Sequence, residues 1–127
     1  MNEAVLDASA LLALLNDEPG ADQVAHYIPG ALINSVNLSE VIGKLAENGM
    51  PEEEIHEVIV LLGLRVVPFD ANLSHKSGLL RPVTKKMGLS LGDRACLATG
   101  IVMNLPVITS DKIWRECDLP VTIVLIR

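Results

Sequence analysis

The segment Val5-Leu6-Asp7-Ala8-Ser9 places one acidic residue between two apolar runs. Residues 4–6 form a short run typical of a β-strand, and residues 8–15 are apolar nearly throughout, which indicates a helix directly after the strand. Residues 107–111, Val-Ile-Thr-Ser-Asp, also join an apolar strand to an acidic residue. In an open parallel sheet such strand ends gather at the carboxyl edge, where ligands bind. The two segments therefore predict a parallel sheet with acidic side chains at one edge.

The rest of the chain alternates between expected strands and expected helices. The strands are expected at residues 4–6, 31–33, 64–69, 106–109 and 121–126. The helices are expected at residues 8–15, 20–28, 38–47, 51–62, 70–80 (with Asp70 as the cap), 92–103 and 111–117. This alternation predicts an α/β fold with a mostly parallel β-sheet flanked by helices. No linker or repeat interrupts it, so we expect residues 1–127 to form a single domain.

Composition narrows the class of protein. Half of the 127 residues are apolar and mostly aliphatic, which suits helices packed on a buried parallel sheet. No apolar stretch approaches the roughly 18–20 residues of a membrane span, and the first residues lack the pattern of a signal peptide. Cys96 and Cys117 are too few and too differently placed for a disulfide framework. We expect a cytoplasmic protein that does not associate with membranes.

The net charge of −6 argues against a general nucleic-acid-binding protein, because such proteins usually carry a basic surface. Aromatic residues, which stack on bases, make up only 2% of the chain. Neither property excludes an acidic metal site that contacts nucleic acid locally.

Four acidic residues at expected helix starts are the candidates for such a site: Asp7, Glu40, Asp93 and Asp111. Carboxylates brought together repel one another unless a cation lies between them, and Mg²⁺ or Mn²⁺ prefers oxygen ligands of this kind. Asp7 is the only charge between residues 4 and 15, so we expect it to be more buried than a surface cap. A buried carboxylate costs several kcal/mol unless it is paired or metal-bound. The pattern predicts metal-dependent phosphoryl chemistry.

Each acid also has an ordinary explanation as a helix cap. Residues 37–40 (Asn to Glu) and 90–93 (Ser to Asp) have the spacing of a capping box. Asp7 and Asp111 stand where an N-cap residue would stand. The two explanations are compatible, since a helix N-terminus keeps an acid ionised and a metal requires an ionised oxygen.

With these residues in view, the chain resembles the PIN domain family, and more closely the small toxin ribonucleases (VapC type) of bacterial toxin–antitoxin pairs. The resemblance covers the whole chain and rests on residues 6–12, 38–41, 89–93 and 105–111, in the family's order. It implies a single PIN-like domain over residues 1–127 and an endoribonuclease toxin that uses Mg²⁺ or Mn²⁺ to hydrolyse RNA phosphodiester bonds. It also implies a cognate antitoxin partner and a homodimer.

The resemblance further implies roles for individual residues. Asp7 and Asp93 would be the principal metal ligands, Glu40 would bind metal or orient the attacking water, and Asp111 would complete the site. The hydroxyls of Ser9, Thr109 and Ser110 would support these carboxylates. Because metal-activated water is the nucleophile in such chemistry, the absence of a serine, cysteine or histidine nucleophile motif is expected.

Two other functions stay open at this point. An aspartyl phosphohydrolase uses a strand-end Asp as its nucleophile, usually with a second Asp two residues later, and here that position is Ser9. A non-catalytic dimerisation or binding module would use the acids only as caps. The apolar helices around residues 24–28 and 55–62 would suit a face between two copies.

Three further features have two interpretations each. Arg81, Lys85 and Lys86 form the only concentrated basic patch, which is either a solvated surface or a contact for an RNA backbone. Arg94, next to Asp93, is less usual for the motif, and its charge either points away or meets RNA or a partner. Trp114 either packs the last helix on the core or stacks on a base.

Overall fold

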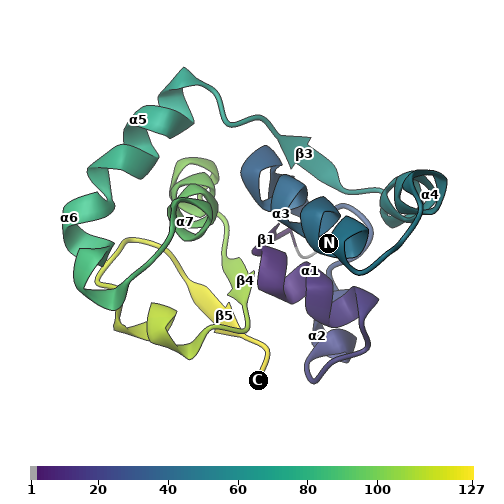
Figure 1. Ribbon diagram of the computed structural model, residues 1–127. Coiled ribbons are helices and arrows are strands. Elements are labelled where there is room, and N and C mark those ends of the chain that lie inside the picture. The colour runs from purple at the N-terminus through teal and green to yellow at the C-terminus, as the bar shows by residue number, and fades with distance from the viewer. Residues whose placement is uncertain (1–2) are drawn as a thin grey trace.

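The computed structural model describes residues 3–127, and within them five short strands form one sheet. The strands are β1 (Val5–Leu6), β2 (Leu32–Asn34), β3 (Arg65–Val67), β4 (Val107–Thr109) and β5 (Ile123–Leu125). Their order is β3-β2-β1-β4-β5, and every neighbouring pair is parallel (Figure 1). The predicted α/β fold with a mostly parallel sheet is confirmed, and the strand that begins the chain lies at its centre.

Helices pack on both faces of this sheet (Figure 1). They are α1 (Ala8–Leu15), α2 (Ala21–Ala25), α3 (Ser35–Glu47), α4 (Glu52–Leu62), α5 (Ala71–Leu79), α6 (Arg81–Thr84) and α7 (Leu91–Met103), with 3₁₀ helices η1 (Lys85–Met87) and η2 (Lys112–Glu116). Successive side chains of a strand point to opposite faces. Leu6, Ile33 and Ile108 therefore join α1 and α3 in one apolar cluster. Their strand neighbours contribute to a second cluster, on α7.

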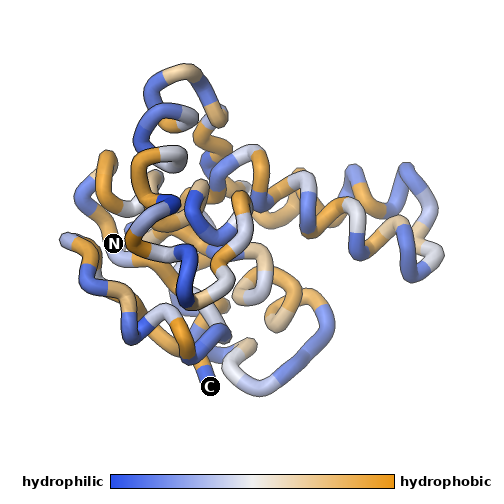
Figure 2. Tube along the Cα trace, turned by 60° about the vertical axis from the view of Figure 1, so that its left-hand side comes forward, coloured by the Kyte–Doolittle hydropathy of each residue, from blue (hydrophilic) through white to orange (hydrophobic). Residues whose placement is uncertain are grey.

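The distribution of polar residues follows these two clusters. In Figure 2 much of the trace in the middle of the molecule is orange, whereas many blue residues lie on the outer turns. Trp114 is fully buried within the second cluster, so the expectation that it packs on the core is confirmed, and stacking on a base is excluded. Cys96 and Cys117 are free thiols. No helix in the described part of the chain is both long and apolar enough to cross a membrane.

The start of α3 differs from the expectation. We expected this helix from residue 38, but it begins at Ser35 because Asn34, the last residue of β2, caps it directly. The side chain of Asn34 accepts a hydrogen bond from the backbone N–H of Val36 at 2.9 Å. Glu40 therefore lies in the second turn of α3 and not at a helix start, and the capping box expected at residues 37–40 is wrong.

The two apolar helices expected at a dimer face are used differently. Val24 of α2 is fully buried inside the chain, so this part of the expected face already belongs to the core. Val60 and Leu61 of α4 are 62% and 83% exposed. Of these two helices, only α4 has large apolar side chains exposed to solvent.

Candidate active site

A cavity of about 480 Å³ opens at the carboxyl edge of the central strand. Five acidic residues line it: the four candidates Asp7, Glu40, Asp93 and Asp111, and in addition Glu47. Asp7 follows β1 and Asp111 lies two residues beyond β4. These two strands pair with Leu6 opposite Ile108, so their ends lie side by side. Glu40 comes from α3 and Asp93 from the first turn of α7. The structure thus brings all four candidate residues to one cavity.

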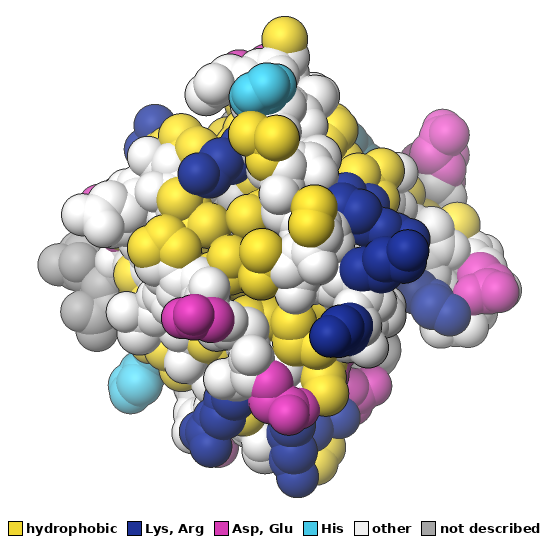
Figure 3. All heavy atoms as spheres, turned by 90° about the vertical axis from the view of Figure 1, so that its left-hand side faces the viewer, with side chains coloured by type: hydrophobic (Ala, Val, Ile, Leu, Met, Phe, Trp, Pro, Cys, Tyr) yellow, Lys and Arg dark blue, Asp and Glu magenta, His cyan; other side chains and the backbone are white. Residues whose placement is uncertain are grey.

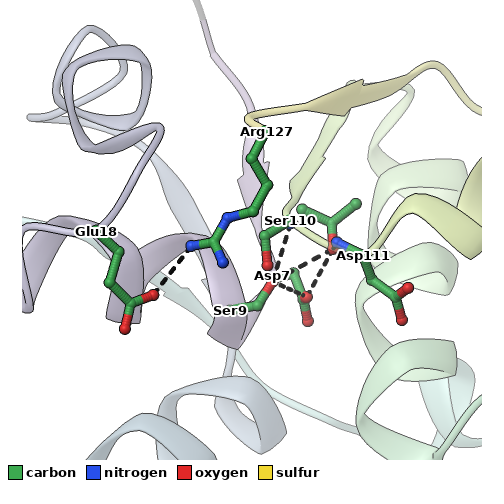
Figure 4. Close-up of polar contacts among 7 residues, drawn as sticks. Asp7, Ser9, Glu18, Ser110, Asp111 and Arg127 are labelled. Atoms are coloured by element: carbon green, nitrogen blue, oxygen red, sulfur yellow. Dashed lines mark hydrogen bonds and ion pairs between the residues drawn. The ribbon is translucent and has the colours of Figure 1, made fainter.

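Asp7 is held by two hydroxyl groups (Figure 4). Ser9 Oγ donates to Asp7 Oδ2 at 2.7 Å, and Thr109 Oγ1 donates to the same oxygen at 2.9 Å. Each hydroxyl accepts a backbone N–H in turn, from Ser110 and Asp111 respectively, both at 3.1 Å. Ser110 contributes its backbone N–H here, where its hydroxyl was expected. This network joins the ends of β1 and β4 and fixes the orientation of the Asp7 carboxylate.

Burial has the largest effect on the pKa of the Asp7 carboxyl. Asp7 is 5% exposed, and desolvation raises its pKa from 3.8 to about 6. The hydrogen bonds from Ser9 and Thr109 lower the pKa of Asp7 in part, and the charge of Asp93 raises it further. Asp7 stands at the N-cap position of α1 but makes no side-chain cap bond, so the capping explanation is wrong for this residue. At neutral pH it is a buried, ionised carboxylate.

Asp93 and Asp111, in contrast, do cap helices. Asp93 Oδ2 accepts the backbone N–H of Ser90 at 2.8 Å, and Ser90 Oγ accepts the N–H of Asp93 at 3.1 Å, which completes the expected capping box. Asp111 Oδ1 accepts the N–H of Ile113 at 3.2 Å. A carboxylate has about four acceptor positions. Capping therefore leaves both groups able to bind a cation in the cavity.

Glu40 is placed by two residues that the sequence analysis missed. The buried Asn37 amide Nδ2 donates to Glu40 Oε1 at 3.1 Å and to the carbonyl oxygen of Gly92 at 2.9 Å, which ties α3 to α7. A Cβ atom at position 92 would overlap the Glu40 carboxylate, so the absence of a side chain there makes room for it. The available signal was Gly92 itself, because glycine inside a helix costs about 1 kcal/mol relative to alanine.

The charge of the cavity is not balanced by the protein. The ion pairs among residues 3–127 join Lys44 to Glu47 at 3.3 Å and Arg127 to Glu18 at 3.0 Å, and neither includes one of the four carboxylates. Lys44 lines the cavity but is occupied by Glu47. Carboxylate oxygens with uncompensated charge suit a hard divalent cation.

The four carboxylates surround the cavity without forming a closed set of ligands. Within residues 3–127, no three His, Cys, Asp or Glu side chains are grouped closely enough to hold one metal ion. The donor atoms fit a divalent cation in chemical type and charge, but their spacing does not form a complete set of ligands.

Arg94 does not neutralise its neighbour Asp93. Its Nη1 atom donates to the carbonyl oxygen of Ser77 on α5 at 3.2 Å. The charge of Arg94 thus points away from the cavity, which is one of the two orientations expected for it.

Comparisons with known proteins agree with this arrangement. A family model described as the PIN domain matches residues 4–119. A search of curated protein sequences finds no match to this chain. Among solved structures, a chain of the DNA-bound VapBC complex from Salmonella typhimurium superposes with a TM-score of 0.74 at 18% identity, covering 97% of each chain.

Two further solved structures are similar. The sarcin-ricin-loop-cleaving toxin VapC20 from Mycobacterium tuberculosis has a TM-score of 0.75 at 15% identity, covering 91% of this chain and 95% of that one. A toxin–antitoxin complex from Klebsiella pneumoniae has a TM-score of 0.71 at 22% identity, covering 92% of each chain. Because the sequence identities are low, these similarities show a shared fold and nothing more.

The raised pKa of Asp7 predicts how stability depends on pH in the metal-free protein. The folded pKa of about 6 exceeds the unfolded value of 3.8. Burial of Asp7 therefore costs nothing below about pH 4. The cost grows as the pH rises to 6 and is about 3 kcal/mol above it. We expect Asp7→Asn to be more stable than the wild type at pH 7.5 in EDTA, with the difference lost at pH 4. Urea unfolding at the two pH values measures this.

Asp93→Ala is the matched control, because it also removes one cavity charge but leaves the backbone N–H of Ser90 without its acceptor and so breaks a capping box. We expect it to lose about 0.5–2 kcal/mol of stability at pH 7.5. If Asp7→Asn were destabilised to the same extent at pH 7.5, burial of the ionised Asp7 carboxylate would not be lowering the stability of the metal-free protein.

Proposed function

Because the chain belongs to the PIN domain family, we propose that it is a metal-dependent endoribonuclease, a VapC-type toxin that hydrolyses RNA phosphodiester bonds in the cytoplasm and is neutralised by a cognate antitoxin. The observation that carries this proposal is the cavity that brings the four candidate carboxylates together, none of which is paired with a cation among residues 3–127. The likeness in fold to an RNA-cleaving toxin and to chains of toxin–antitoxin complexes supports it.

Asp7, Glu40, Asp93 and Asp111 are the proposed ligands of Mg²⁺ or Mn²⁺. A divalent ion at this place supplies Lewis acidity toward the phosphate and lowers the pKa of water. The protein contributes the fixed geometry. The hydroxyls of Ser9 and Thr109 hold the Asp7 carboxylate in one orientation, and the capping bonds hold Asp93 at the start of α7.

Glu40 differs from the other three acids in its surroundings. It caps no helix, it is exposed, and its Oε1 atom is occupied by the Asn37 amide. Its second oxygen, Oε2, is therefore the atom available to orient water or accept its proton during attack on the phosphate.

The two alternative functions lack a supporting observation. An aspartyl phosphohydrolase usually has a second Asp two residues after its nucleophile, but that position is Ser9, whose hydroxyl donates to Asp7 Oδ2. A pure binding module would use the acids as caps, and Asp7 caps nothing. Association of two copies remains part of the proposal, with the exposed residues Val60 and Leu61 of α4 as the apolar contact.

The first test is RNA cleavage by the purified protein. We expect cleavage that EDTA abolishes and added Mn²⁺ or Mg²⁺ restores, and a loss of at least a hundredfold in the Asp7→Asn/Asp93→Asn double variant, since two ligand charges are removed. Expression of the wild type should arrest bacterial growth, and expression of the double variant should not. Undiminished cleavage by the double variant would refute the assignment.

The second test concerns the placement of Glu40. Gly92→Ala adds a methyl group where the Glu40 carboxylate lies, so we expect Glu40 to move away from the Asn37 amide and Mn²⁺ affinity to fall about tenfold or more. Gly78→Ala is the matched control, because Gly78 lies within α5 and nothing lies within 4 Å of the added Cβ atom. Mn²⁺ titration of both variants, followed by calorimetry, measures the effect. Equal affinities would show that Glu40 does not take part in metal binding.

The third test concerns the inhibitor. We expect a cognate antitoxin to place an arginine or lysine side chain against the four carboxylates, because the cavity attracts a cation and Lys44, the cation in its lining, is paired with Glu47. Co-purification from an operon should yield the complex. Replacing the cationic residue of the antitoxin by alanine should then restore RNA cleavage. An antitoxin that inhibits equally well without any cationic contact would contradict this prediction.

A further inference from the structure

Charge is distributed very unevenly along this chain. Residues 71–115 contain seven of the ten lysine and arginine residues but only two of the sixteen acids, a net charge of +5 within a chain of −6. Those two acids are Asp93 and Asp111, which line the cavity. Residues 1–70 hold twelve acids and only Lys44 and Arg65 as cations. The cavity therefore combines Asp7 and Glu40, from the acidic half of the chain (residues 1–70), with Asp93 and Asp111, from the basic half (residues 71–115).

The basic half forms one side of the molecule, made by α5, α6, η1, η2 and the outer surface of α7 (Figure 1). Figure 3 views this side and shows dark blue side chains around an apolar centre, with a few magenta acidic side chains among them. We define the basic face by its exposed cations, which are Arg81, Lys85, Lys86, Lys112 and Arg115.

The cations of the basic face are not used to hold the fold together. Within residues 3–127 the two ion pairs involve Lys44 and Arg127, so none of the five is paired with an acid. Among the elements that make this side, Glu116 at the end of η2 is the acid that lies outside the cavity, and twelve of the sixteen acids of the chain lie in residues 1–70. Unpaired cations concentrated on one side produce a positive potential that attracts a polyanion.

The basic face also lies next to the cavity along the chain. Lys112 directly follows Asp111 and begins η2. Lys85 and Lys86 form η1, which ends three residues before Ser90 caps α7, and Asp93 lies in the first turn of that helix. Both carboxylates of the basic half are therefore flanked by cations of the face.

We propose that the phosphate backbone of single-stranded RNA runs across the basic face, where these cations contact phosphates next to the one in the cavity. This inference rests on the proposed endoribonuclease function. The acidic half of the chain repels the strand, so the RNA is held on one side of the cavity only. Cations contact phosphates whatever the base, so the contact is to the backbone, and the fully buried Trp114 takes no part in it.

Binding of a fluorescently labelled oligouridylate in EDTA tests this without cleavage. The variant Arg81→Gln/Lys85→Gln/Lys86→Gln removes three charges and keeps polar side chains of similar reach. We expect at least a tenfold loss of affinity at low salt. The slope of log Kd against log salt should decrease by about 2, since each phosphate contact on a single strand contributes roughly 0.7.

Two controls match this variant. Arg65→Gln removes an exposed cation from β3, outside the basic face, and should leave affinity within about twofold of the wild type. Arg81→Lys/Lys85→Arg/Lys86→Arg keeps the charge at the same three positions and should bind RNA as the wild type does. This variant separates loss of charge from loss of folding.

Equal affinity and equal salt slope in the wild type and the glutamine variant would overturn the proposal. A glutamine variant that binds RNA normally but loses the neutralising protein would also overturn it, because the basic face would then be a protein-docking surface. Either failure is distinct from failure of the proposed function, which is measured separately as Mn²⁺-dependent cleavage by the wild type.

Discussion

The hydrogen-bonded Asp7 carboxylate is the interaction on which the site depends. Pairing of β1 with β4 continues into Asp7, whose backbone N–H donates to Ile108 at 2.9 Å, so the side chain emerges between the two strand ends. Hydroxyls from both sides then bind one of its oxygens. A buried charge with no cation beside it is costly. The fold accepts this cost at the one place where four acids share a cavity, as proteins commonly do at functional sites.

The other three carboxylates are held in place by interactions that cost less free energy than burial of Asp7. Asp93 and Asp111 use backbone N–H groups at helix starts, which stabilise the helix and hold the carboxylate ionised. Glu40 uses the Asn37 amide and the space left by Gly92. Because neither ion pair among residues 3–127 includes one of these four carboxylates, the cavity keeps its negative charge for a ligand from outside.

Much of the fold follows from local pattern. The alternation of apolar runs predicted the α/β class. The cap at Asp70 and the capping box at residues 90–93 were also predicted correctly, because their bonds join residues three apart. The start of α3 was wrong, since Asn34 and Asn37 are equally good caps by residue type. Sheet pairing decides between them, because it extends β2 up to Asn34 and leaves that residue to begin the helix.

The sequence by itself determined the class of fold, the identity of the four acids and the capping of two of them, because these depend on composition, periodicity and contacts within one turn. Tertiary structure alone decided that Asp7 is desolvated, that Thr109 reaches it across about a hundred residues, and that position 92 must be empty for Glu40. These properties depend on the strand order β2-β1-β4 and on the approach of α3 to α7. Both arise from packing between distant segments, which no local pattern in the chain records.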